Sequence, residues 1–547
     1  MNQEDGYQLI QVNRAYHNHF LPWLYHSIEI REPSQFDQLI KATHGHDHVR
    51  KISIYRRLDH QCMNKIPKLF PSLVKFFEDT EWCPQAATYF KPLQNLTSLT
   101  LSDVTSVKMA LDVCKLLPRL TDLDLNCSEV EPVSPGFLEK VSNACPLLET
   151  FHLVGSKAIV DPEPLVAFQP AKLLRKLELH INYGLDQHDP WLAYIGKKYP
   201  NLRFLTLDNY MGKIKAAYNA TPEFYRWFLE SLSQLTYMKW SNVFPHPSYF
   251  KMAGQYLEEK NKKMQICVAF DSHPITTYFL KLCTLKESDM SAITSARLSV
   301  GPSMSYDQAL KIIRDKCPRL EHLGLEMLDF LHPNDVNVGA VLNLFPRLTS
   351  FCCHHVCVSK QMDKVIDNHP LRKACFFRVV VPSRVFDQFS LHCPNLKKLD
   401  VVGTGLPDAD INLPNHRLNK VVIEDIDWAS RTRMLRYPTT RIRLFQAQQA
   451  NTEPVWFFLE RCELTELGDL RATSIVKLDE KDAQFVNTAL VNQSRGSKTN
   501  YMKHQKSHPS STFKGYDIEP IIRVGYVKLV CHSVNELLIS KKQVCPG

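Results

Sequence analysis

The feature of this sequence that most constrains its fold is a short motif, L-x-x-L-x-L, that recurs along most of the chain. Its clearest copies, here called strict although Phe, Val, Ile or Cys replaces some of the later leucines, begin at Leu96, Leu120, Leu148, Leu174, Leu202, Leu320, Leu348, Leu396 and Leu418. Looser copies begin at Val49, Leu73, Leu235, Lys263, Ile293 and Leu371. Self-similarity at a period of about 26 residues predicts a solenoid of stacked units, not a row of independent globular domains.

Each copy of the motif predicts a short strand preceded by a helix. In the copy at Leu120, Leu123 and Leu125 alternate with Asp122 and Asp124, and a period of two places the leucines on one face of a strand. The stretch before a motif, such as 306–316, has apolar residues three or four apart and predicts an amphipathic helix. These helices are expected to end at X-Pro steps, since proline cannot continue a helix.

Strands and helices that alternate in this way predict an α/β solenoid. The segments CPLLETFHL, CPRLEHLGL and CPNLKKLDV resemble the ribonuclease-inhibitor-like, cysteine-containing leucine-rich repeats, over about residues 49–480. The resemblance implies a horseshoe with parallel strands on the concave face and helices on the convex face. The Asn or Cys usual eight residues after the anchor is mostly absent, so we expect irregular strand-to-helix loops.

Composition excludes several other classes of protein. The chain has 547 residues, of which 44% are hydrophobic, and no apolar run approaches the ~18 residues that a membrane span needs. The first residues contain no apolar signal segment, so the 16 cysteines are interpreted as reduced thiols of an intracellular protein, cytoplasmic, nuclear or both. A net charge of +9 is mild for this length, and we expect neither a membrane nor a nucleic-acid partner.

Residues 7–30 depart from the repeat pattern. Apolar residues recur there at helical spacing, and the segments VNRAY and LPWLY resemble the C-terminal half of an F-box, whose opening L-P-x-E-I-L segment has no counterpart here. Residues 1–30 are therefore predicted to form partial F-box-like helices. The resemblance implies that a Skp-type adaptor binds Leu9, Val12, Tyr16, Leu21, Pro22, Leu24 and Tyr25. The alternative is an ordinary helical cap over the first repeat.

After the helices, we expect the solenoid over residues 31–482, a disordered insertion over 483–516 and a C-terminal repeat or cap over 517–547. The insertion lacks acidic residues and apolar periodicity and carries five basic residues. Further repeats are possible around Leu444, Leu464 and Leu537, where the register weakens.

Catalytic and metal-binding motifs have little support. G-x-S-x-G, G-x-x-x-x-G-K-[ST], G-x-G-x-x-G and H-E-x-x-H do not occur, so we expect no enzyme and no cofactor. The cluster 44–48, HGHDH, is interpreted as a hydrated connector. In CCHHVC, over 352–357, the register places Cys353 in the core and Cys352 and His354 on the opposite face, which argues against one shared zinc ion.

The concave face is the remaining candidate site, because a long solenoid presents one preformed surface. Its outward positions follow from the register of the strands. The candidate substrate-binding residues are Asp122, Asp124, His152, Phe204, Tyr237, Lys239, His322 and Glu326. Exposed aromatic side chains such as Phe204 and Tyr237 commonly dominate the binding energy of protein interfaces.

By resemblance, the expected function is that of an F-box substrate receptor in an SCF-type cullin–RING ubiquitin ligase. Its partners would be a Skp-type adaptor, a cullin and an unidentified protein substrate. One alternative is a ligase-independent interaction scaffold. Another, suggested only by the basic segment 483–516, is an RNA-associated repeat protein.

Overall fold

The computed structural model describes the chain in two compact units, residues 1–269 and 270–547, here called the N-terminal and C-terminal units. Residues outside the described part are 1–18, 20–21, 23–24, 42–45, 80–86, 103, 105, 128–131, 161–168, 186–188, 211–220, 244, 247, 271–279, 281–282, 284–289, 300–304, 327–334, 360–362, 404–409, 425–443, 465–469, 496–511, 514–515, 518–525, 540–541 and 545–547.

The N-terminal unit is built on one sheet of parallel strands in chain order. These strands are β1 (Ser27–Ile30), β2 (Lys51–Ile54), β3 (Lys75–Glu78), β4 (Ser98–Leu101), β5 (Asp122–Cys127), β6 (Thr150–Lys157), β7 (Lys176–Tyr183), β8 (Phe204–Asn209), β9 (Tyr237–Ser241) and β10 (Gln265–Phe270). Each strand pairs in parallel with the next. The solenoid sheet therefore begins at Ser27, which corrects the predicted boundary at residue 31.

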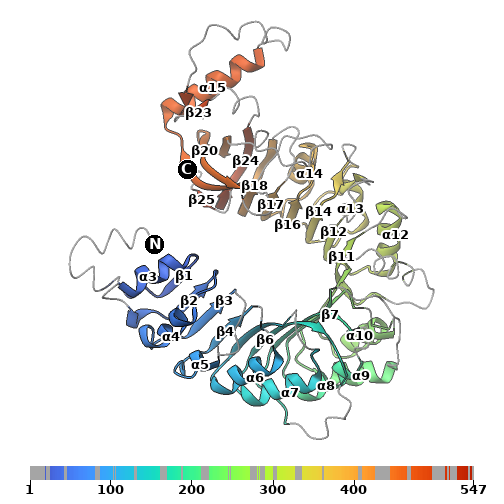
Figure 1. Cartoon of the computed structure of the whole chain (residues 1–547). Helices are drawn as coiled ribbons and strands as arrows, with labels where there is room; N and C mark the ends of the chain where they lie inside the picture. Colours follow the sequence, from blue (N-terminus) through green and yellow to red (C-terminus); the bar gives the residue numbers. More distant parts are fainter. Residues whose placement is uncertain are drawn as a thin grey trace. The chain divides into compact units, whose positions relative to one another are not determined.

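Helices connect successive strands and lie on one side of the sheet (Figure 1). They are α3 (Pro33–Lys41), α4 (His60–Leu69), α5 (Ala87–Phe90), α6 (Val107–Leu116), α7 (Pro135–Ala144), α8 (Asp189–Lys198), α9 (Pro222–Ser231) and α10 (Ser248–Glu259). Several begin at a side-chain cap; Ser106, for example, accepts a hydrogen bond from the amide of Met109. The face of the sheet away from the helices is here called the open face.

Two rows of apolar side chains between the sheet and the helices form the core of the N-terminal unit. One row runs through Leu99, Leu123, Phe151, Leu177, Leu205, Met238 and Ile266, and the other through Leu101, Leu125, Leu153, Leu179, Leu207, Trp240 and Val268. All are buried, as are the nine strict anchor leucines. One repeat cannot bury such a face alone, so each repeat depends on its neighbours.

The C-terminal unit continues the same architecture. Its parallel strands are β11 (Ile293–Ser299), β12 (His322–Glu326), β14 (Ser350–His354), β16 (Lys373–Phe377), β17 (Lys398–Val402) and β18 (Asp410–Glu424), with α12 (Tyr306–Lys316), α13 (Val338–Leu344) and α14 (Arg384–His392) on one side (Figure 1). A separate two-stranded ladder joins β13 (Asp335–Val336) to β15 (Cys357–Val358). The C-terminal caps of α12, α13 and α14 are Cys317, Phe345 and Cys393, each followed by proline, as predicted.

Together these observations confirm the predicted fold class. The chain is an α/β leucine-rich-repeat solenoid with parallel strands on one face and helices on the other. Among the residues that the structure describes, no helix combines the length and apolar content that crossing a bilayer requires.

One parallel strand of the sheet comes from the end of the chain and lies between two earlier strands. β24 (Tyr526–Ile539) pairs in parallel with β18, and β19 (Leu444–Gln449) pairs in parallel with the other edge of β24. Val534, Leu537 and Ile539 are buried, so the possible repeat around Leu537 corresponds to a parallel strand of the sheet. The antiparallel strands β20 (Val455–Leu464) and β21 (Leu470–Lys477) follow β19, and β25 (Lys542–Val544) follows β24. The repeat suggested at Leu464 is wrong, because that segment forms a hairpin.

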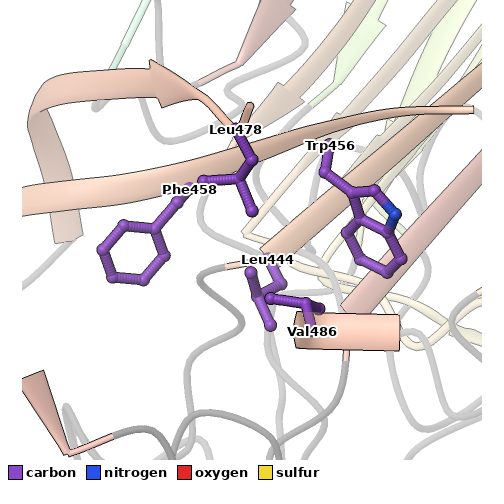
Figure 2. Packing of buried hydrophobic residues seen from close by; sticks show 5 residues of the cluster. All are labelled: Leu444, Trp456, Phe458, Leu478 and Val486. Carbon is purple, nitrogen blue, oxygen red and sulfur yellow. The ribbon is translucent and has the colours of Figure 1, made fainter. Parts of the chain in front are cut away.

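The predicted disordered insertion also needs correction. Helix α15 (Glu480–Arg495) covers its first part, and β22 (Thr512–Phe513) and β23 (Tyr516–Asp517) form a small ladder. Val486 on α15 is fully buried and belongs to a cluster with Leu444, Trp456, Phe458 and Leu478, the five residues drawn in Figure 2. Ala483, Val486 and Leu490 have helical spacing, but the polar and basic residues of 492–514 dominate the composition of the predicted insertion. Residues 496–511 lie outside the described part.

Candidate functional site

Six of the predicted substrate-binding residues lie together on the open face of the N-terminal unit. Cross-strand register aligns Asp122, Thr150, Lys176, Phe204 and Tyr237 in one row. A second row contains Asp124, His152, Glu178, Thr206 and Lys239. Asp122, Asp124, His152, Phe204, Tyr237 and Lys239 therefore share one sheet face over β5 to β9, as the strand periodicity predicts. We call these two rows the N-terminal open patch.

An aromatic pair marks one end of this patch. Phe204 and Tyr237 are register partners on β8 and β9, with ring centroids 6.2 Å apart. Phe204 is 44% exposed, whereas Tyr237 is only partly exposed. Burial is the main cause that raises the pKa of Tyr237, and its hydroxyl also interacts with Cys267. Phe204 is thus the more available of the two for a partner.

Two histidine–aspartate pairs connect neighbouring strands of the patch. His152 Nδ1 lies 2.6 Å from Asp124 Oδ1, and His180 Nδ1 lies 3.1 Å from Asp208 Oδ2. The two imidazole rings meet edge to face, with centroids 4.9 Å apart. The hydrogen bond to Asp124 raises the pKa of His152, against the lowering effect of burial. This links four side chains into one network, which single-strand periodicity could not reveal.

Further polar contacts surround the network. Lys176 Nζ lies 2.8 Å from Glu178 Oε2 on the same strand. Ser98 donates to Asp122 across 3.1 Å. The patch therefore combines an exposed aromatic ring with both signs of charge, a composition suited to binding a polar protein surface with an apolar anchor.

His322 and Glu326 lie on β12, on the open face of the C-terminal unit. Glu326 is paired with Arg297, whose Nη2 lies 2.7 Å from its Oε2. Burial lowers the pKa of His322. These two predicted residues share a strand, but they belong to a different unit from the other six.

The strand that contains Cys352 has the orientation predicted from its sequence. Phe351 and Cys353 are fully buried, while Cys352 and His354 are partly exposed on the open face. The ring of His354 stacks on Phe377, with centroids 4.6 Å apart. Cys375 on β16 is the register partner of Cys352. Sequence reasoning missed this neighbour, because only strand register joins residues that are separated by a whole repeat.

The predicted adaptor-binding residues fall mostly outside the described part. Leu9, Val12, Tyr16, Leu21 and Leu24 are not described, whereas Pro22 and Tyr25 are partly exposed. The adaptor-binding prediction therefore stays a prediction.

The histidine cluster at 44–48 is described only in part. His46 and His48 lie in a short 3-10 helix, and His46 Nε2 contacts the Leu39 carbonyl oxygen at 2.9 Å. The His46 ring also packs edge-on against Phe70. Within the described residues, no group of three or more His, Cys, Asp or Glu side chains is placed to hold a metal ion.

Comparisons with known proteins find similarity only at the level of solved structures. No protein-family model matches the chain, and no curated protein is a significant match. TLR13 in its complex with ssRNA13 is 14% identical to this chain. The match covers 74% of this chain and 59% of the TLR13 chain, with a TM-score of 0.37. A leucine-rich-repeat protein of Leptospira interrogans is 10% identical. The match covers 72% of this chain and 93% of the Leptospira chain, with a TM-score of 0.30.

A chain of the yeast Rad7 and Elc1 complex is 13% identical, covers 74% of this chain and 88% of its own, and has a TM-score of 0.34. At scores this low, the likenesses add nothing to the leucine-rich-repeat assignment, which rests on the strand register and the buried repeat positions.

Proposed function

We propose that the chain is a protein-recognition receptor of an SCF-type cullin–RING ubiquitin ligase. The single observation that carries the recognition role is the N-terminal open patch, where Phe204 is exposed beside Tyr237 on a preformed sheet. Ring area held on rigid strands contributes binding energy with little loss of conformational entropy. We also propose that the chain's leucine-rich repeats are of the cysteine-containing type.

The ligase role is supported by the resemblance of residues 7–30 to an F-box. In this role, Leu9, Val12 and Leu24 place apolar side chains against a Skp-type adaptor, which joins the receptor to a cullin. The receptor performs no bond chemistry itself; it holds a target protein close to the transfer machinery. Such a protein works in the cytoplasm or nucleus, where its thiols stay reduced.

One experiment with two arms tests both parts of the proposal. Tagged chain is purified from cells, and co-purifying adaptor, cullin and other proteins are quantified. Val12→Asp and Leu24→Asp should remove adaptor and cullin but keep the target proteins. Phe204→Ala should remove the target proteins but keep adaptor and cullin. The Phe204 ring is exposed, so its loss should leave folding almost unchanged.

Direct titration of labelled adaptor completes the adaptor arm. We expect weak binding by the chain and tighter binding when an N-terminal L-P-x-E-I-L-type helix is added. A helix that buries more apolar area contributes roughly 25 cal/mol per Å² before other costs, which amounts to orders of magnitude in the dissociation constant. If neither version binds, or if the Asp substitutions have no effect, residues 7–30 are a solenoid cap and the chain is a ligase-independent scaffold.

A further inference from the structure

Two cysteines of the C-terminal unit face each other across adjacent strands. Cys352 on β14 and Cys375 on β16 are direct register partners in the open-face row. Neighbouring strands lie about 4.8 Å apart, within the ~4.4–6.8 Å range of Cα separations that a disulfide spans. Cys352 is partly exposed, whereas Cys375 is buried. A small reagent from solvent therefore meets Cys352 first.

An acidic side chain follows the two sulfurs in the same row. Asp400 on β17 is the register partner of Cys375, and Cys375 Sγ lies 3.3 Å from Asp400 Oδ2 as a donor. Lys398 Nζ lies 3.2 Å from the same carboxylate oxygen. Asp400 thus contacts a lysine and accepts a hydrogen bond from Cys375.

The surroundings of the pair separate the two thiols chemically. A hydrogen bond from Cys375, together with the nearby His354 and Lys373, lowers the pKa of Cys352 to about 5, although burial opposes this. The pKa of Cys375 is raised, by its hydrogen bond to Cys352 and by burial. Cys375 has one proton, so it donates either to Cys352 or to Asp400, and not to both.

Lys373 supplies positive charge beside the thiols. Burial alone would lower the pKa of Lys373, but attraction to Cys375, Cys352 and Asp400 raises it above the usual value. These surroundings favour a thiolate at Cys352 and a thiol at Cys375, with Lys373 and Lys398 nearby. A thiolate next to a second thiol is the arrangement in which one sulfur attacks and the other resolves the product.

We propose that Cys352 and Cys375 form an oxidation site, at which hydrogen peroxide converts the facing pair into a disulfide across the open face of the C-terminal unit. This inference goes beyond the proposed function and does not depend on it, since the chemistry requires only the folded chain and a peroxide.

The reaction balances in two steps. The Cys352 thiolate attacks one peroxide oxygen; the S–O bond forms, the O–O bond breaks and hydroxide leaves, which gives a sulfenic acid. Cys375 then loses its proton to Asp400 and attacks the Cys352 sulfur; the S–S bond forms, the S–O bond breaks, and the leaving hydroxide takes that proton from Asp400 and departs as water. The two sulfurs lose two electrons in total, and the peroxide is reduced by the same two.

Mass spectrometry of the full chain tests this proposal directly. Folded protein is treated with hydrogen peroxide, its remaining thiols are alkylated, and it is digested with trypsin without reduction. We expect peptide 348–360 linked to peptide 374–378, two hydrogen atoms lighter than their sum, with fragmentation assigning the bond to Cys352. Reduction with dithiothreitol should separate the two peptides.

Matched variants assign the roles of the sulfurs. In Cys375→Ser the linked peptide should disappear, and Cys352 should be labelled by dimedone, a reagent for sulfenic acids. In Cys352→Ser both the link and the label should disappear. Cys353→Ala removes the fully buried thiol from the same peptide and should leave the link intact. Absence of the link in oxidised wild-type protein, or a link that persists in Cys352→Ser, would overturn the proposal.

Discussion

At the scale of single residues, neighbouring strands change the chemistry of side chains more than their own strand does. Asp124 raises the pKa of His152 from a strand 28 residues away in sequence. Cys375 lowers the pKa of Cys352 in the same way, whereas Cys353, the next residue along the chain, is buried and has a raised pKa. The site chemistry is therefore a property of the rows across the sheet.

The His152–Asp124 pair predicts a pH-dependent contribution to stability. The pKa of His152 is raised above 6.5 in the folded protein, so the folded state binds more protons than the unfolded chain. The pair's contribution to the free energy of unfolding is complete below about pH 6.5 and is lost as the pH rises through the raised pKa. Asp124→Asn should therefore lower the free energy of unfolding at pH 5.5 and hardly change it at pH 9. The loss at pH 5.5 should be less than about 1 kcal/mol, because both side chains are partly exposed.

Nuclear magnetic resonance of histidine-labelled protein checks this directly, with His152→Gln to assign the resonance. The pKa of His152 should fall in Asp124→Asn and stay unchanged in Asp122→Asn, whose carboxylate contacts Ser98 instead. Glu178 also raises the pKa of His152, whereas burial and Lys176 lower it, and the ring of His180 packs beside it, so in Asp124→Asn only Glu178 still favours the protonated form. An unaltered pKa in Asp124→Asn would show that Asp124 is not its main cause.

At the scale of elements, most helices lie between two repeat strands, but α15 lies outside that pattern. It packs through Val486 against residues of β19 and β20 and against Leu478. Ala483 also packs against this cluster, whereas the neighbouring Phe485 is exposed, so the described apolar contact lies on one face of the helix. A charged side chain at that contact would have to be buried without a partner.

Val486→Asp should therefore release α15 from the cluster of Figure 2, at a cost of a few kcal/mol. Limited trypsin digestion should then cut faster after Lys481, within the helix. Phe485→Asp, one residue earlier on the same helix but exposed, should digest like the wild type. Equal digestion of all three proteins would mean that the helix is not held through Val486.

At the scale of the whole molecule, the two units differ in how their sheets are completed. The strands of the N-terminal unit pair in chain order, from β1 to β10. In the C-terminal unit β24 lies between β18 and β19, so one strand from the end of the chain joins two earlier segments. Because solenoid stability is a sum of nearest-neighbour terms, losing that strand should affect its own unit first.

A chain ending at residue 525 should show this difference by hydrogen exchange. We expect faster exchange in β17 and β18, with β5 to β8 unchanged, since those strands keep their partners. A chain ending at residue 541 loses only β25, which pairs with three residues of β24, and should exchange much like the full chain. Faster exchange spread evenly over both units would contradict nearest-neighbour stabilisation.

The sequence alone was enough for the strands, their core-facing residues and the solenoid class, because a strand's alternation and a helix's apolar spacing are local properties. It therefore also placed Asp122, Asp124, His152, Phe204, Tyr237 and Lys239 correctly on one face. It failed for α15, because the polar and basic residues of 492–514 dominate the composition of the segment that contains most of this helix.

Only the tertiary structure decided which strands are neighbours. The meeting of Cys352 with Cys375, the link from His152 to His180 and the position of β24 beside β18 all depend on how far each connecting loop shifts the next strand. Side-chain direction repeats every two residues and is written in the local sequence. Pairing between residues 23 to 118 positions apart is fixed by packing of the whole repeat array, which no local pattern encodes.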